Sequence, residues 1–129
     1  MEDKKIFFIE DVKDIINLYS DPLRKAGYAI ESYANGNEAL AGINSVAEGK
    51  ASVPKFIILD LMLPDISGLE ILKVIRDKAV FNDTAVFIFT NYGDDKFKDA
   101  IKPFSKVTYL LKVDTPPFKL AELISNSAA

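Results

Sequence analysis

The stretch Phe56-Ile57-Ile58-Leu59-Asp60-Leu61-Met62-Leu63-Pro64-Asp65-Ile66-Ser67-Gly68 carries the strongest fold signal in this chain. Its first four residues are all apolar, which is typical of a strand covered on both faces. Asp60 stands where this strand would end, and Pro64 and Gly68 then indicate a turn. Ligands of parallel α/β sheets bind at the carboxyl ends of the strands, so Asp60 is a candidate site residue.

A second acidic position follows another apolar run. Glu10 and Asp11 come directly after residues 6–9, which read Ile-Phe-Phe-Ile. Two strands that end in acids at one edge of a sheet predict a cluster of carboxylates, and such a cluster favours a hard divalent cation. The local alternatives are that Glu10 and Asp11 cap the following helix and that Asp60 is only a turn residue.

Composition limits the classes of protein and of chemistry. The 129 residues suit one compact domain spanning 1–129, and 49% of them are hydrophobic, which is enough for a sizeable core. The chain has no cysteine and no histidine, which excludes disulfides, thiolate metal sites and Ser-His catalysis. The net charge is −3 without a basic stripe, which argues against direct nucleic-acid binding. The chain lacks an apolar signal segment and a membrane-spanning run, so we expect a cytoplasmic protein.

Strand-like runs alternate with helical periodicity along the whole chain. Strands are predicted at residues 6–9, 28–33, 56–59, 84–89 and 107–111. Helices are predicted from 12 to a stop at 27, from after 37 to near 49, after 68, around 97–104 and after 115. This alternation predicts a five-stranded parallel sheet, doubly wound with helices on both faces. The pattern leaves the order of the strands open.

Several local signals refine the expected boundaries. Pro22 is expected to kink or end the first helix early, because proline lacks a backbone donor. Asn35-Gly36-Asn37 is predicted to form a turn that caps the second helix, and Thr115 is the expected N-cap of the last one. Residues 91–95 are predicted to form a loop, and the tail at 125–129 is expected to fray.

Four strand ends converge on one crevice if the first strand lies near the middle of the sheet. These ends carry Glu10 and Asp11, Asp60, Thr90 and Lys112. The set fits the handling of a phosphoryl group. Mg²⁺ can bridge carboxylates to phosphate, a carboxylate can act as the nucleophile, and a lysine and a hydroxyl can hold phosphoryl oxygens.

These residues, taken in order, resemble the receiver domain of response regulators, the phospho-acceptor half of two-component signalling. The resemblance covers essentially the whole chain. It is carried by Glu10-Asp11, by the stretch from Asp60 through Met62 and Pro64 to Gly68, by Thr90, and by Tyr109-Leu110-Leu111-Lys112. It implies a flavodoxin-like fold with strand order 2-1-3-4-5.

The resemblance implies a role for each residue of the metal and acceptor site. Asp60 would accept the phosphoryl group. Asp11 would bind Mg²⁺ or Mn²⁺ directly, Glu10 would bind it through a water, and the backbone carbonyl of Met62 would be a further ligand. Lys112 would pair with Asp60 at rest and with the phosphoryl group afterwards.

The resemblance also implies a switch. Thr90 would hydrogen-bond a phosphoryl oxygen, and Tyr109 would move inward when the threonine is pulled, which couples a local charge change to a bistable surface. The output surface would consist of the fourth helix, the fifth strand and the fifth helix. A downstream protein would bind there, and a homodimer through the same surface stays open.

The implied phosphodonor is a histidine kinase, a phosphotransfer protein or a small phosphodonor. The domain would catalyse only its own phosphorylation and dephosphorylation, so it would not be an enzyme in the usual sense. The sequence leaves open whether the chain stands alone or is part of a longer regulator. The alternatives are an interaction module that phosphate does not switch and, less favoured, a small Mg²⁺-dependent hydrolase. The hydrolase would need a general acid where Met62 stands.

The chain departs from the receiver pattern after the lysine, where proline is usual and Val113 stands instead. A cis bond is costly before any residue other than proline. We therefore expect the loop before the last helix to follow a different path, while Lys112 keeps its role.

Overall fold

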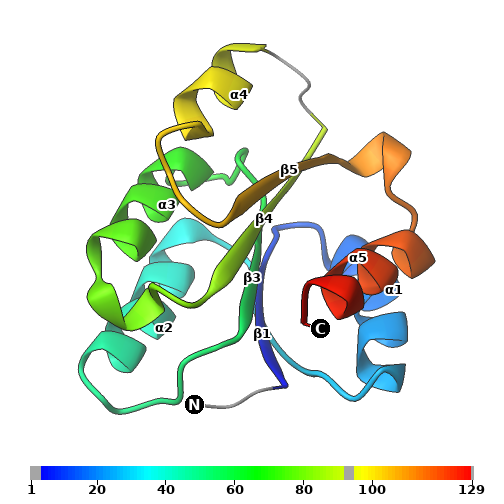
Figure 1. Cartoon of the computed structure of the whole chain (residues 1–129), viewed down its shortest axis with the longest axis horizontal. Coiled ribbons are helices and arrows are strands. Elements are labelled where there is room, and N and C mark those ends of the chain that lie inside the picture. Colours follow the sequence, from blue (N-terminus) through cyan, green and yellow to red (C-terminus); the bar gives the residue numbers. More distant parts are fainter. Residues whose placement is uncertain (1–3, 92–94, 129) are drawn as a thin grey trace.

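The structure, a computed structural model, describes residues 4–91 and 95–128. Strands and helices alternate along the chain as the hydrophobic pattern predicted (Figure 1). The strands are β1 (Lys5–Ile9), β2 (Ala29–Tyr33), β3 (Phe56–Leu59), β4 (Ala85–Thr90) and β5 (Val107–Leu111). The α-helices are α1 (Lys13–Lys25), α2 (Gly36–Ala47), α3 (Gly68–Asp77), α4 (Asp95–Ile101) and α5 (Pro117–Ala128). The short 3-10 helices η1 (Ala79–Phe81) and η2 (Lys112–Asp114) were not predicted.

The strands form one parallel sheet in the order β2-β1-β3-β4-β5, which confirms the predicted order. β1 and β3 are neighbours, and their last residues, Ile9 and Leu59, lie opposite one another. The residues that follow these two strands are therefore brought together at one edge of the sheet. This edge is also where the strand order reverses, which is the usual ligand-binding position in such sheets.

Successive side chains of each strand point to opposite faces, so the sheet has a core on each side. α2 and α3 cover one face, where Phe7 and Ile57 are fully buried (Figure 1). α1 and α5 cover the other face, where Phe8 and Phe89 are fully buried. Because both faces are covered, β1, β3 and β4 are apolar almost throughout rather than alternating.

The first helix runs past Pro22, so the predicted early end at this proline was wrong. Leu23 follows the proline, is fully buried and packs in the core beneath α1 and α5, which holds the last turn in place. The stop predicted at Gly27 is confirmed. Gly27 has a φ of 99°, and the Tyr28 N–H donates to the Leu23 carbonyl oxygen, as in a Schellman motif.

Thr115 does not cap the last helix, contrary to the prediction. α5 begins at Pro117, and the N–H groups of its first turn donate to the Pro116 carbonyl oxygen. The Thr115 hydroxyl instead donates to the Leu111 carbonyl oxygen at 2.7 Å. The cap signal was misread because a local pattern does not show that this hydroxyl turns back toward β5.

The last helix is longer than the sequence indicated. α5 continues to Ala128, so residues 125–128 are helical where a frayed tail was expected. Ile124 is fully buried, Ala128 packs against the same core, and the Ser127 hydroxyl donates to the Leu123 carbonyl oxygen at 2.9 Å. Tertiary packing therefore stabilises a turn whose own sequence is small and polar.

The predicted loop at 91–95 lies largely outside the described residues, since these omit 92–94. The segment after Lys112, where the resemblance led us to expect a different path, forms η2. Within this turn the Thr115 N–H donates to the Lys112 carbonyl oxygen at 3.2 Å. In the described part of the chain, each helix is too short or too polar to cross a lipid bilayer.

Candidate functional site

Glu10 and Asp11 follow β1 but differ sharply in burial. The Glu10 side chain is fully buried, and its Oε2 accepts a hydrogen bond from the Val12 N–H at 3.1 Å. Asp11 is exposed. Val12 occupies the N-cap position of α1 and makes no side-chain cap bond there. The two acids are therefore not the N-cap of this helix, which was the alternative for them.

Asp60 follows β3 directly beside these acids. Its N–H donates to the Ile9 carbonyl oxygen at 3.0 Å and extends the ladder between β1 and β3 by one residue. Its side chain is nearly buried, and Oδ1 accepts from the Met62 N–H at 3.1 Å. The loop then folds back on itself, and the Gly68 N–H donates to the Leu61 carbonyl oxygen at 2.9 Å. This tight return starts α3 close to Asp60.

Lys112 brings a positive charge to both buried acids. Its Nζ donates a hydrogen bond to Asp60 Oδ2 at 3.0 Å. The same Nζ lies 2.5 Å from Glu10 Oε1, a close ion pair that is not aligned as a hydrogen bond. Nζ is also 5.6 Å from the centroid of the Phe89 ring, which is within the range of cation–π attraction. Glu10, Asp60 and Lys112, which are far apart in the sequence, therefore meet at the ends of β1, β3 and β5.

The three acids form a cluster that suits a divalent cation. Glu10, Asp11 and Asp60 each offer a carboxylate oxygen, and these oxygens lie within 4.8 Å of one another. A set made only of oxygen donors suits Mg²⁺ or Mn²⁺. The single ammonium of Lys112 cannot neutralise three carboxylates, so a cation held between them would relieve their repulsion.

The pKa values of Glu10 and Lys112 are both raised, but for different reasons. Burial raises the pKa of the Glu10 carboxyl, although Lys112 and the Val12 N–H offset part of this effect. Burial alone would lower the pKa of Lys112, but the ion pair with Glu10 and the charge of Asp60 outweigh this effect and the pKa rises. Lys112 therefore stays charged at neutral pH, and Glu10 takes up a proton more readily than an ordinary glutamate.

Thr90 lies on β4, the strand next to β3, and Tyr109 lies on β5, the edge strand next to β4. Thr90 ends β4, is fully buried and pairs in register with Leu111, the residue before Lys112. Tyr109 is half-buried on β5 and packs against the core beneath α2 and α3. Lys98 of α4 lies with Nζ 5.7 Å from the centroid of the Tyr109 ring. The strand register thus places Thr90 beside the lysine, while the switch roles of Thr90 and Tyr109 stay predictions.

Comparison with known families agrees with this arrangement. Residues 6–126 match the response regulator receiver domain. The chain belongs to the response regulator receiver domain family. Receiver domains act in two-component signalling and phosphorelays, with histidine kinases and phosphotransferases as partners. They are signalling proteins and not conventional enzymes.

Individual relatives of this receiver domain differ in length. It is 29% identical over 123 residues to sporulation initiation phosphotransferase F of Bacillus subtilis, covering 95% of this chain and 90% of that protein. It is 29% identical over 124 residues to the transcriptional regulatory protein TrcR of Mycobacterium tuberculosis, covering 95% of this chain and 43% of TrcR. The chain thus spans about half the length of the first curated relatives that it matches.

A solved structure supports the likeness of the fold. The response regulator TrrA of Thermotoga maritima, determined in complex with Mg²⁺ and BeF, superposes with a TM-score of 0.77 at 26% identity. The match covers 98% of this chain and 99% of that chain. A relative with the same fold thus holds a divalent cation, and the acidic cluster of this receiver domain suits one as well.

Asp65 connects the loop after β3 to the start of α2, a role that its position in the sequence does not reveal. Its carboxylate accepts from the N–H groups of Gly36 at 2.7 Å and Asn37 at 2.9 Å, at the start of α2, and from Ile66 at 2.9 Å. Desolvation alone would raise the pKa of Asp65, but the hydrogen bonds from the backbone N–H groups together outweigh it and lower the pKa. Asp65 thereby ties the loop that follows Asp60 to α2. The partners on α2 are 28 and 29 residues away, so a local pattern could not show them.

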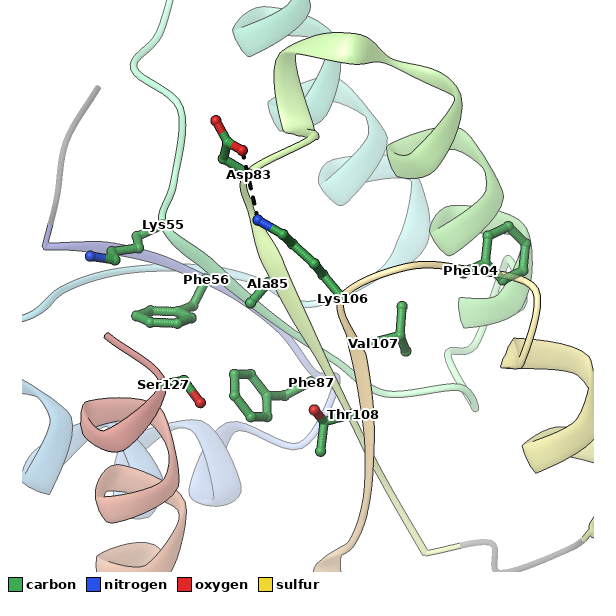
Figure 2. Close-up of a pocket in the computed structure, with 10 residues that line it drawn as sticks. All are labelled: Lys55, Phe56, Asp83, Ala85, Phe87, Phe104, Lys106, Val107, Thr108 and Ser127. Carbon is green, nitrogen blue, oxygen red and sulfur yellow. Dashed lines mark ion pairs between the residues drawn. The ribbon is translucent and has the colours of Figure 1, made fainter. Parts of the chain in front are cut away.

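A cavity of about 400 Å³ lies at the opposite edge of the sheet (Figure 2). Phe56 and Ala85, the first residues of β3 and β4, line it, whereas Asp60 and Thr90 stand at the other ends of these strands. Figure 2 also shows Phe87 and Thr108 at this cavity, together with the ion pair of Lys106 and Asp83. The two charged groups of this pair are 3.7 Å apart. The cavity is therefore separate from the acidic cluster of the receiver domain.

Proposed function

We propose that this receiver domain is a phospho-acceptor in which Asp60 takes a phosphoryl group in the presence of a divalent cation. The observation that carries the proposal is the contact of one Lys112 ammonium with both Asp60 and Glu10. An acceptor carboxylate needs a nearby cationic group that pairs with it before the transfer and neutralises the oxygens of the phosphoryl group afterwards. The side chain of Lys112 already lies against Asp60, so a small movement suffices.

The transfer needs no proton from the protein. A carboxylate oxygen of Asp60 attacks the phosphorus atom, and the bond from phosphorus to the leaving group of the donor breaks. The leaving group keeps the electron pair. Lys112 then neutralises the phosphoryl oxygens, and the Thr90 hydroxyl donates to one of them. Later attack of water on phosphorus releases inorganic phosphate and restores Asp60.

The divalent cation would be held by Asp11 and Asp60 directly, by the Met62 carbonyl, and by Glu10 through a water. When bound, Mg²⁺ or Mn²⁺ supplies the positive charge that lets anionic phosphate approach the carboxylates. The distribution of burial supports this division of roles, since Asp11 is exposed whereas Glu10 is buried and bonded to Val12.

The response to phosphorylation would pass through Thr90 and Tyr109 to the surface of α4, β5 and α5. A downstream protein would bind this surface, or a second copy of the chain would do so as a homodimer. The phosphodonor would be a histidine kinase or a phosphotransfer protein, and a cytoplasmic location follows from that role. Tyr109 supports this path because it lies between the core and Lys98 of α4.

Incubation with Mg²⁺ and acetyl phosphate tests the proposal. We expect a phosphoryl adduct on the intact wild-type protein by mass spectrometry and none on Asp60→Asn. The control is Asp83→Asn, which removes an exposed carboxylate far from the site and should leave the adduct intact. An absent wild-type adduct would instead support the phosphate-independent interaction module. Many turnovers on unrelated phosphoesters would support the hydrolase.

Mg²⁺ is expected to raise the melting temperature by a few degrees. A ligand at ten times its dissociation constant adds about 1.4 kcal/mol to the free energy of unfolding, provided that it binds only the native state. Differential scanning fluorimetry across millimolar MgCl₂ measures the shift. We expect Asp83→Asn to keep the shift and Asp11→Asn to reduce it. Identical wild-type curves with and without Mg²⁺ would contradict the metal site.

A further inference from the structure

The turn that carries Lys112 has few backbone bonds of its own. Within η2, the Thr115 N–H donates to the Lys112 carbonyl oxygen at 3.2 Å. The residue after the lysine, Val113, is 81% exposed and does not anchor the turn in the core. The ammonium of Lys112 is nevertheless held against two buried acids. Other groups must therefore fix the path of the backbone here.

Two side-chain hydrogen bonds fix this path at Thr115. The hydroxyl of Tyr19, on α1, donates to the Thr115 carbonyl oxygen at 2.7 Å. The hydroxyl of Thr115 donates to the Leu111 carbonyl oxygen, also at 2.7 Å. The bond from Tyr19 is buried and the bond from Thr115 is partly buried, so the first of them is shielded from bulk water. The end of the turn is thus tied to α1 on one side and to the end of β5 on the other.

Tyr19 is also linked to the Lys112 side chain through the ring of Phe89. Its ring meets the Phe89 ring edge-on, with the centroids 4.8 Å apart and the planes at 64°. Phe89 is the ring whose centroid lies 5.6 Å from Lys112 Nζ. Tyr19 therefore contacts both the backbone that follows Lys112 and the aromatic ring beneath its ammonium. Burial raises the pKa of Tyr19, so its phenol is a neutral donor at pH 7.

We propose that Tyr19 is a positioning residue for Lys112. Its hydroxyl holds the turn in the path that keeps the ammonium at Asp60, in a chain with valine after the lysine. Without that hydroxyl the turn becomes freer, and Lys112 spends less time where the phosphoryl group arrives. This inference rests on the proposed function, since it assigns Tyr19 a part in phosphorylation.

Tyr19→Phe tests the inference because it keeps the ring contact with Phe89 and removes only the hydroxyl. We expect phosphorylation by acetyl phosphate at saturating Mg²⁺ to be about fivefold to tenfold slower, as for the loss of one buried hydrogen bond. The Mg²⁺ concentration that gives half the maximal rate should stay within about twofold. The candidate metal ligands lie after β1 and β3, whereas this bond holds the turn after β5.

Tyr28→Phe is the matched control. Tyr28 is another buried tyrosine of the same core, and its ring contacts Phe56 at the far edge of the sheet. We expect this variant to react at the wild-type rate. A second pair of variants tests the other bond. Thr115→Val removes the hydroxyl and should slow the reaction, whereas Thr115→Ser keeps the hydroxyl and should preserve the rate.

Two results would overturn the inference. One is a Tyr19→Phe rate equal to that of Tyr28→Phe. The other is a parallel change in rate and in Mg²⁺ dependence, which would indicate a general loosening of the fold. A different result would contradict the proposed function, namely that the wild-type protein forms no phosphoryl adduct at all. An adduct that forms equally fast on wild type and Tyr19→Phe would overturn the positioning role alone.

Discussion

Gly68→Ala is expected to lower the free energy of unfolding by about 3 kcal/mol and the melting temperature by roughly 10 to 15 °C. A Cβ atom at position 68 would overlap the Asp60 carbonyl oxygen and lie 2.6 Å from the Leu61 Cα atom. Both are backbone atoms, so neither can rotate away as a side chain could. The loop must shift instead, and we expect phosphorylation of Asp60 and binding of Mg²⁺ to weaken together with stability.

Gly42→Ala is the matched control for this substitution. A Cβ atom at position 42, on α2, would meet the hydroxyl end of the Tyr33 side chain, which can move aside. Alanine also favours the helix, so the net change should stay within about 1 kcal/mol. Urea and thermal denaturation compare the two variants. Equal stabilities of Gly42→Ala and Gly68→Ala would contradict the tight return after Asp60.

Lys112→Ala is expected to cost about 3 kcal/mol of stability at pH 8 in the absence of divalent cations. The substitution leaves Glu10, which is fully buried, and Asp60, which is nearly buried, without their shared counter-charge. Millimolar Mg²⁺ should restore part of the loss, since a cation can take over this neutralisation. Chemical denaturation with and without MgCl₂ measures both effects.

The loss in Lys112→Ala is expected to shrink as the pH falls from 8 to 5. The pKa of Glu10 is raised in the folded state, so the cost of its buried charge is present above that pKa and disappears toward pH 4.5. In the wild type the raised pKa of Lys112 shows that the charged lysine stabilises the folded state, whereas the raised pKa of Glu10 shows that the charged glutamate destabilises it. The contribution of Lys112 is complete below pH 10.5 and is lost as the pH rises through the folded-state pKa.

Lys73→Ala provides the control for a lysine in an exposed pair. Lys73 lies 3.4 Å from Glu70, one turn away on α3, and both side chains are more than half exposed. Such pairs contribute little, so the change should stay within about 0.5 kcal/mol at either pH. A loss in Lys112→Ala no larger than this, or equal losses at pH 5 and pH 8, would contradict the buried ion-pair arrangement.

The hydrophobic pattern predicted the layers of the fold because strands that are buried on both faces have continuous apolar sequences. β1, β3 and β4 are apolar almost throughout, and the residues after them include Glu10 and Asp60. The strand order needed the resemblance, since alternation alone allows several windings. The end expected at Pro22 failed because a local preference of about 3 kcal/mol gave way to packing of Leu23 in the core. The cap expected at Thr115 failed because its hydroxyl donates to the Leu111 carbonyl oxygen instead.

The amino-acid order alone was enough to say that acids, a threonine and a lysine end the strands of one parallel sheet. This follows because strand direction and side-chain alternation are local properties of the chain. Packing was needed to bury Glu10 while leaving Asp11 exposed, and to join Tyr19 to Thr115 across 96 residues. Burial and long-range hydrogen bonds depend on how whole elements meet in space, and a linear pattern does not contain that information.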